Sequence, residues 1–142
     1  MNKSSLDVVG IGNAIVDVLM TTDDALLERL SFEKGSMTLI NEAKAKELYQ
    51  IASNGIQSSG GSVANSLACI SELGGKAAFI GRVKNDKLGE IFTEEITKTG
   101  TIFQTPPSTG DTPTARCLIF VTPDAQRTMC TYLGASVLLE PK

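Results

Sequence analysis

The stretch that decides how this chain folds is SGGSVANS, residues 59–66. Gly60 and Gly61 lack a Cβ and can adopt positive φ, so a loop built on them can approach another group closely. Apolar residues at helical spacing follow, and the pattern ends at the glycine pair 74–75. This pattern predicts a helix between the two glycine pairs.

The start of that helix is a candidate binding site. Backbone amides at a helix N-terminus, aided by the helix dipole, suit hydroxyl groups or anions. Asn65 stands one turn into the helix and is expected to point toward the same space. The alternative is a plain Gly-Gly turn before a core helix.

A buried parallel strand is predicted at VVGIG, residues 8–12, because a short apolar run closed by glycine is typical of such strands. Its Gly-x-Gly also suggests a dinucleotide site, but Ile15 stands where a third glycine is required. We expect the strand to present Asn13 and Asp17 beyond its carboxyl end, where open α/β sheets bind ligands. A carboxylate there can accept two sugar hydroxyls; otherwise Asp17 is a turn or capping residue.

The rest of the chain alternates strand and helix patterns and then changes to a hairpin. The β–α–β–α order predicts a parallel sheet with crossover helices. The hairpin is either an edge extension of that sheet or a separate small sheet over the site. The expected helices are 25–30, 41–51 and 87–99, the expected strands are 36–40, 77–81, 114–122 and 126–133, and 53–59 is expected to be a polar loop.

Length and composition indicate one globular domain without a nucleic-acid or membrane partner. The 142 residues are 42% hydrophobic and 20% charged, and the net charge of −3 gives no basic surface. No apolar run approaches the ~20 residues that span a bilayer, and the N-terminus lacks a signal-peptide core. Three cysteines without a Cys-x-x-Cys pair predict reduced thiols in the cytoplasm, and the absence of histidine excludes the usual His-based acid–base and zinc sites within this chain.

Three motifs in order, DVVGIGNAIVD (7–17), SGGSVANS (59–66) and GRVKNDKLG (81–89), resemble the N-terminal half of the ribokinase (PfkB) family of sugar and nucleoside kinases. The resemblance runs from residue 7 to 136. It implies an α/β fold with a ribokinase-like parallel sheet, flanking helices and a small β-sheet lid that closes to exclude water. Residues 1–142 would be the N-terminal part of that domain, with the C-terminal half of the fold absent and lid segments near 18–21, 36–40, 114–122 and 126–133.

The resemblance also assigns roles to single residues. Asn13 and Asp17 match residues that hold sugar hydroxyls, and Gly60, Gly61 and Asn65 match the loop and helix start that complete the pocket.

Further matches lie in the lid segments. Arg127 falls where the nucleoside-kinase branch places an arginine that reaches the transferred phosphate; the alternative is an exposed arginine after a hairpin turn. The residues that match the lining of the base or acceptor pocket are Met37, Cys117, Met129, Thr131 and Leu133. Their alternative is packing within the lid, and Cys117 is expected to be a buried small residue rather than a nucleophile.

The stretches KGSMTLI (34–40) and RTMCTYLGA (127–135) look most like bacterial adenosine-kinase-like sequences. The implied function is transfer of the ATP γ-phosphate, with Mg, to the hydroxymethyl group of adenosine or a related nucleoside or sugar. The alternatives are a sugar kinase with a ribose- or fructose-like acceptor, a non-catalytic binding module, or a structural partner that completes its sheet on a second chain.

The family's catalytic aspartate lies in a Gly-Ala-Gly-Asp motif that this sequence lacks, since Gly134-Ala135 is followed by Ser136. The family's ATP pocket also lies mostly in the half that is absent here. We therefore expect no catalytic residue in this chain and no phosphoryl transfer by it alone. Strands without neighbours predict a homodimer or a complementary C-terminal chain as partner.

Overall fold

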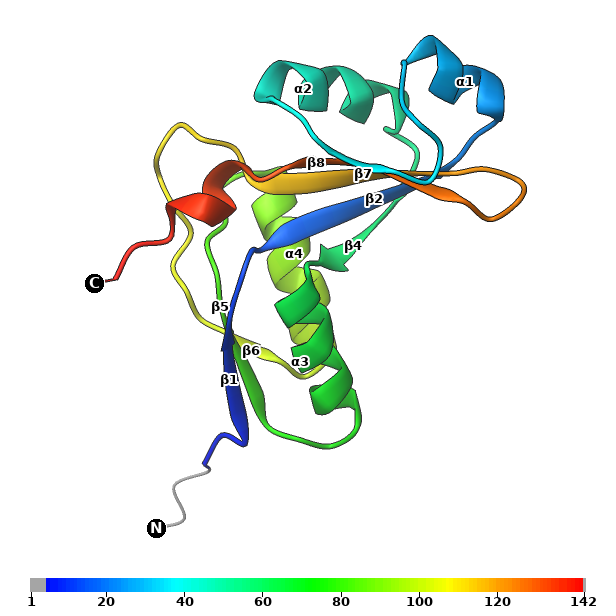
Figure 1. Cartoon of the computed structure of the whole chain (residues 1–142). Coiled ribbons are helices and arrows are strands. Elements are labelled where there is room, and N and C mark those ends of the chain that lie inside the picture. The colour runs from blue at the N-terminus through cyan, green and yellow to red at the C-terminus, as the bar shows by residue number, and fades with distance from the viewer. Residues whose placement is uncertain (1–4, 142) are drawn as a thin grey trace.

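The computed structural model describes residues 5–141, which form two sheets with helices around them (Figure 1). The first sheet is parallel, with the strand order β1-β5-β6, and the second is mixed, with the order β3-β8-β7-β2-β4. The strands are β1 (Val8–Ile11), β2 (Ile15–Thr21), β3 (Met37–Leu39), β4 (Ile56–Gly60), β5 (Ala77–Ile80), β6 (Ile102–Phe103), β7 (Ala115–Val121) and β8 (Arg127–Tyr132). The helices are α1 (Asp24–Arg29), α2 (Glu42–Ile51), α3 (Ser62–Glu72) and α4 (Lys87–Lys98), followed by the 3₁₀ turn η1 (Gly134–Leu138). The α/β fold with a parallel sheet, flanking helices and a second sheet agrees with the expectation from the sequence.

One face of the first sheet packs against α3 and α4. A Cβ placed on Gly10 of β1 would lie 2.6 Å from Val63 Cγ1 and 2.8 Å from Leu67 Cδ1, so only glycine lets this strand approach α3 so closely. On α4, the buried ring of Phe92 lies 5.7 Å from Phe79 and 5.3 Å from Phe103, centroid to centroid. These contacts fix α3 relative to the carboxyl end of β1.

The second sheet has one face covered by helices and one face that points away from them. The Arg116 guanidinium on β7 lies 5.4 Å from the ring centroid of Tyr49 on α2. Side chains on the same face of the sheet as Arg116 are buried toward the helices, among them Val16 and Leu118. Figure 1 shows α1 and α2 over this face, and α4 contacts β2 and β4. Successive side chains of a strand point to opposite faces, so Asp17 and the residues beside it on adjacent strands face away from the helices.

One expectation from the sequence is wrong. Residues 53–59, expected to be a polar loop, include most of β4, which pairs antiparallel with β2 so that Gly60 lies opposite Ile15. No apolar pattern marked this strand, because β4 is a sheet edge whose stability comes from backbone pairing rather than from apolar side chains. Asp17, expected beyond the carboxyl end of β1, follows β1 and lies within β2.

The helices expected from the sequence are confirmed within one or two residues, including their caps. Asn41 accepts a hydrogen bond from the Lys44 amide and Asp86 accepts one from the Gly89 amide. Within the described residues, the chain has no helix with the length and apolar character needed to cross a membrane.

Asp86 also joins α4 to the start of β7. Its second carboxylate oxygen accepts the Thr114 amide at 3.0 Å, and the Thr114 hydroxyl donates to Oδ1 at 2.7 Å. We predict that Asp86→Ala lowers the free energy of unfolding by about 1–3 kcal/mol, because a helix cap and a buried threonine lose their partner together. Urea denaturation measures this change.

Asp23→Ala is the control for this prediction, because Asp23 caps α1 through a single bond to the Leu26 amide. A loss no larger in Asp86→Ala than in Asp23→Ala would show that the Thr114 bonds add nothing.

Candidate functional site

The candidate site lies where the two sheets meet the start of α3. The chain leaves β1 at Ile11, passes Asn13 and enters β2 at Ile15. Gly61 precedes α3 with φ of 99°, and a Cβ there would lie 2.5 Å from the Asn13 carbonyl oxygen. Only glycine satisfies both the conformation and the close approach. The start of α3 is thereby held against the link between the sheets.

Asp17 lies on the floor of this site. Its carboxylate stands directly over Gly60, so any Cβ at Gly60 would collide with all three carboxyl atoms. Burial raises the pKa of Asp17 to about 6 from an ordinary value of 3.8. Among residues 5–141 no group donates a hydrogen bond to this carboxylate. A half-buried carboxylate without protein donors is suited to accept hydroxyls from a ligand.

Asn13 and Asn65 are exposed and flank Gly61. The Asn65 backbone amide donates to the Gly61 carbonyl at 2.9 Å as part of the first turn of α3, and the exposed Asn65 side chain lies on that turn. The structure therefore gathers five of the predicted residues at one place, namely Asn13, Asp17, Gly60, Gly61 and Asn65.

Two rows of side chains cross the open face of the second sheet beside Asp17. Neighbours within each row are ~5 Å apart, because they stand on adjacent strands. The first row is partly polar, and the second is apolar and begins one pleat further from Gly60. The first row is Ser58, Asp17, Cys117, Thr131 and Leu39, and the second is Ile56, Leu19, Ile119, Met129 and Met37.

The strand register thus brings Met37, Cys117, Met129 and Thr131 onto the face that carries Asp17. Met37 is 57% exposed, whereas Cys117 is buried. The Thr131 hydroxyl donates to Cys117 Sγ at 3.3 Å, and burial raises the pKa of Cys117 to about 11. This thiol stays protonated near neutral pH and lines the site rather than reacting.

The two remaining lid positions are Arg127 and Leu133. Arg127 opens β8 opposite Val121, which pairs with Thr21. This register puts Arg127 four residues along the strand direction from Asp17, roughly 13 Å. Arg127 is exposed, and Leu133 lies half-buried just before η1. The strand register therefore separates Arg127 from Asp17, whereas Leu133 follows two residues after Thr131 of the polar row.

Five lining positions were not singled out from the sequence, namely Leu19, Leu39, Ile56, Ser58 and Ile119. Ser58 was missed because its strand was taken for a loop. Residues 56–60 show no alternation of apolar and polar side chains, so no local pattern could have placed Ser58 on this face.

No cluster of three or more histidine, cysteine, aspartate or glutamate side chains that could hold a metal ion occurs within residues 5–141.

Residues 17–142 match the family described as pfkB family carbohydrate kinase. The chain belongs to this family. The resemblance of its three motifs to ribokinase-type kinases is thereby confirmed. No curated protein sequence matched the chain.

Solved structures of other pfkB-like kinases superpose closely on this chain. The adenosine kinase from Sinorhizobium meliloti is 49% identical, with a TM-score of 0.85 over 96% of this chain and 42% of that one. A probable sugar kinase from Rhizobium etli CFN 42 is 45% identical, with a TM-score of 0.85, and the match covers 96% of this chain and 41% of that one. Adenosine kinase from Anopheles gambiae, in complex with P1,P4-di(adenosine-5) tetraphosphate, is 29% identical, with a TM-score of 0.83. The match covers 94% of this chain and 41% of that one. This pfkB chain thus spans about two fifths of the length of the structures it matches.

The raised pKa of Asp17 predicts how stability depends on pH. Because the folded state holds this proton more tightly than the unfolded state, stability falls as pH rises from about 4 to about 6. We expect Asp17→Asn to lose this fall, a difference on the order of 1–2 kcal/mol after allowance for solvent at the half-buried carboxylate. Urea titrations of both proteins at pH 4 and pH 7 measure it.

Subtracting the two titrations cancels every other titrating group. One such group is Asp124, whose pKa its bond to Lys34 lowers to about 2. Parallel curves for the two proteins would contradict the burial of the Asp17 carboxylate.

Gly60→Ala tests the contact between Gly60 and Asp17. The added methyl group must displace the carboxylate toward solvent, so the Asp17 pKa is expected to drop toward 3.8. Carboxyl ¹³C shifts followed against pH report this change. Gly110→Ala is the matched control, because a Cβ there meets only Ser108 Oγ, at 3.4 Å. An unchanged Asp17 titration in Gly60→Ala would refute the contact.

Proposed function

We propose that this chain is the acceptor-binding part of an ATP-dependent phosphotransferase whose acceptor group is the hydroxymethyl of adenosine or a related nucleoside. The carrying observation is the Asp17 carboxylate, which is half-buried, lies over Gly60 and has no donor among the described residues. Membership of the pfkB family supports the kinase class, and the adenosine kinases among the similar structures support the acceptor.

In this proposal each element of the site has a separate task. The ionised Asp17 accepts two ribose hydroxyls, and Asn13 and Asn65 supply further polar contacts at the start of α3. The apolar row that ends in Met129 and Met37 supports the plane of the base. The second sheet acts as a lid, which is formed by segments 18–21, 36–40, 114–122 and 126–133. Closure of this lid excludes water and moves Arg127 toward the phosphate.

ATP supplies the transferred phosphoryl group, and Mg neutralises its charge. The Gly-Ala-Gly-Asp motif that carries the family's catalytic base does not occur in this sequence, so we place that base and most of the ATP and Mg site outside this chain. Alone, the chain is then inactive in transfer and retains acceptor binding. A complementary C-terminal chain or a second copy would complete it, in the cytoplasm and without a nucleic-acid or membrane partner.

A sugar acceptor of ribose or fructose type is the second candidate. The similarity to the probable sugar kinase from Rhizobium etli favours it, and so does the polar row around Asp17 and Ser58. The apolar row favours the nucleoside, because its exposed members Leu19, Ile56 and Met37 would stay uncovered by a sugar alone.

Calorimetric titration of the chain with adenosine and with ribose tests the function. We expect adenosine to bind and Asp17→Asn to weaken it by at least tenfold, because a charge-assisted pair of hydrogen bonds is lost. Asp111→Asn, at an exposed loop position, is the matched control and keeps the affinity. Tighter binding of ribose would assign the sugar instead, and binding of neither would refute an acceptor site.

A coupled assay of ADP release tests the second half of the proposal. The purified chain should show no adenosine-dependent turnover at its intact mass of 15.0 kDa. Turnover at that mass, with no second polypeptide present, would show that the catalytic base lies within the chain after all.

A further inference from the structure

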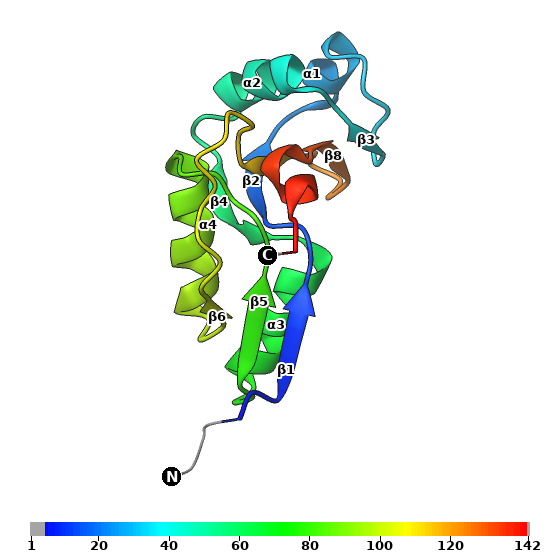
Figure 2. The ribbon, with the colours of Figure 1, turned by 90° about the vertical axis from the view of Figure 1, so that its left-hand side faces the viewer.

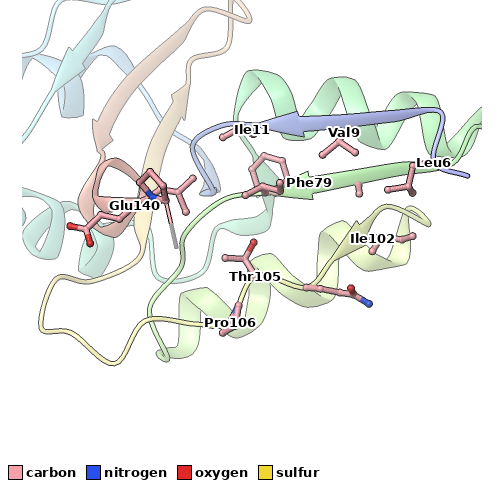
Figure 3. Close-up of a pocket in the computed structure, with 13 residues that line it drawn as sticks. Leu6, Val9, Ile11, Phe79, Ile102, Thr105, Pro106 and Glu140 are labelled. Carbon is pink, nitrogen blue, oxygen red and sulfur yellow. The ribbon is translucent and has the colours of Figure 1, made fainter.

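Two connections of the second sheet run past the first sheet. The link 104–114 leads from β6 to β7, and η1 leads away from β8. Figure 2 shows η1, in red, between the second sheet and the carboxyl ends of β1 and β5. Thr105 of the link and Glu140, which follows η1, line one groove of about 820 Å³ over the first sheet (Figure 3). The position of one sheet relative to the other therefore depends on what holds these two connections.

Arg82 joins the two connections to the end of β5. Its guanidinium donates through Nη1 to the Leu138 carbonyl at the end of η1, and through Nη2 to Ser108 Oγ in the link at 2.9 Å. Ser108 is itself fixed on the same segment, because its amide donates to the Val83 carbonyl and its carbonyl accepts the Asn85 amide, each at 2.8 Å. Among the described residues, Arg82 is the one side chain that bonds both connections.

The surroundings of Arg82 suit positioning more than stabilisation. Within the described part of the chain no carboxylate forms an ion pair with it, and its buried Nε has no hydrogen-bond partner. A partly buried charge without an acid beside it contributes little net stability. The planar guanidinium instead supplies geometry, because its separate N–H groups bind two acceptors at once.

We propose that Arg82 is a positioning residue that fixes the angle of the second sheet on the first. The Ala135 amide donates to the Pro113 carbonyl at 2.8 Å, so η1 and the link are also joined to each other and Arg82 holds them as one unit. The consequence for binding rests on the function proposed above. Asp17 lies on the second sheet and the start of α3 packs on the first, so a ligand that contacts both gains affinity when the angle is preset.

The competing account is that Arg82 only stabilises the fold. The backbone bonds of Ser108 and the bonds between Thr114 and Asp86 would then hold the link without it. The two accounts differ in what a variant changes. Loss of a stabilising contact lowers the free energy of unfolding and leaves the sheet angle of the folded state unchanged, whereas loss of a positioning contact broadens the range of angles.

Distances between two spin labels, measured by double electron–electron resonance, report the angle. Cys69 is an exposed thiol on α3, and Ala43→Cys adds a second exposed thiol on α2, which packs on the second sheet. The chain without Ala43→Cys should give no pair distance, because Cys117 and Cys130 are buried. We expect a narrow distribution when Arg82 is present and one about twice as broad in Arg82→Met. Arg82→Lys should also broaden it, because an ammonium does not reproduce the planar fork.

Arg29→Met is the matched control, because Arg29 is exposed at the end of α1. It should keep the narrow distribution, whereas Ser108→Ala, which removes one of the two acceptors, should give an intermediate width. Circular dichroism shows whether each variant is folded, and Ser108→Ala decides the question if Arg82→Met does not fold. Unchanged width in the folded variants, or equal broadening in Arg29→Met, overturns the proposal.

Adenosine titration of the same variants separates this proposal from the proposed function. Arg82→Met should lower the affinity about fivefold, because the competent angle is then populated for only part of the time. An unchanged affinity beside a broadened distribution would overturn the link between the angle and binding. Failure of the unsubstituted chain to bind adenosine would contradict the proposed function alone, since the label distances are measured without a ligand.

Discussion

The contact between the Asp17 carboxylate and Gly60 is the constraint on which the site depends. It requires β4 to lie beside β2 in one register, and it requires glycine at that position because a methyl group would occupy the space of the carboxylate. The next residue, Gly61, turns directly into α3 through positive φ. One glycine pair therefore places a carboxylate, a sheet edge and a helix start within reach of a single ligand.

The two sheets are coupled through the same region. α3 is held close to β1 by Gly10, and its first residue follows β4 without an intervening loop. The chain crosses between the sheets at Asn13, at Gly61 with α3, and along residues 104–114, so a movement of the second sheet relative to the first must bend these links. Such an arrangement suits closure of one layer over a ligand that rests on the other.

The sequence predicted the elements that carry strong local signals. The helix expected at 87–99 is α4, and the hairpin expected from strands 114–122 and 126–133 is the antiparallel pair β7 and β8. β4 was not found, because an edge strand with polar side chains has no periodic pattern to detect. The residues on the Asp17 face followed from family resemblance, whereas their arrangement in two rows required the register of five strands, which no local pattern encodes. The distance between Arg127 and Asp17 could not be predicted either, because it also depends on the register of the strands.

The most direct test of the account is a ¹H–¹⁵N NMR map of the chain with and without adenosine. The account predicts amide shifts that centre on Asn13, Gly60 and Gly61 and extend to Cys117 and Thr131, with the β1 face unchanged. Shifts centred on Val9, Ile11 and Ile80 instead would place the ligand in the apolar groove that these residues line on the first sheet. That result would contradict the assignment of the acceptor site to Asp17 and its neighbours.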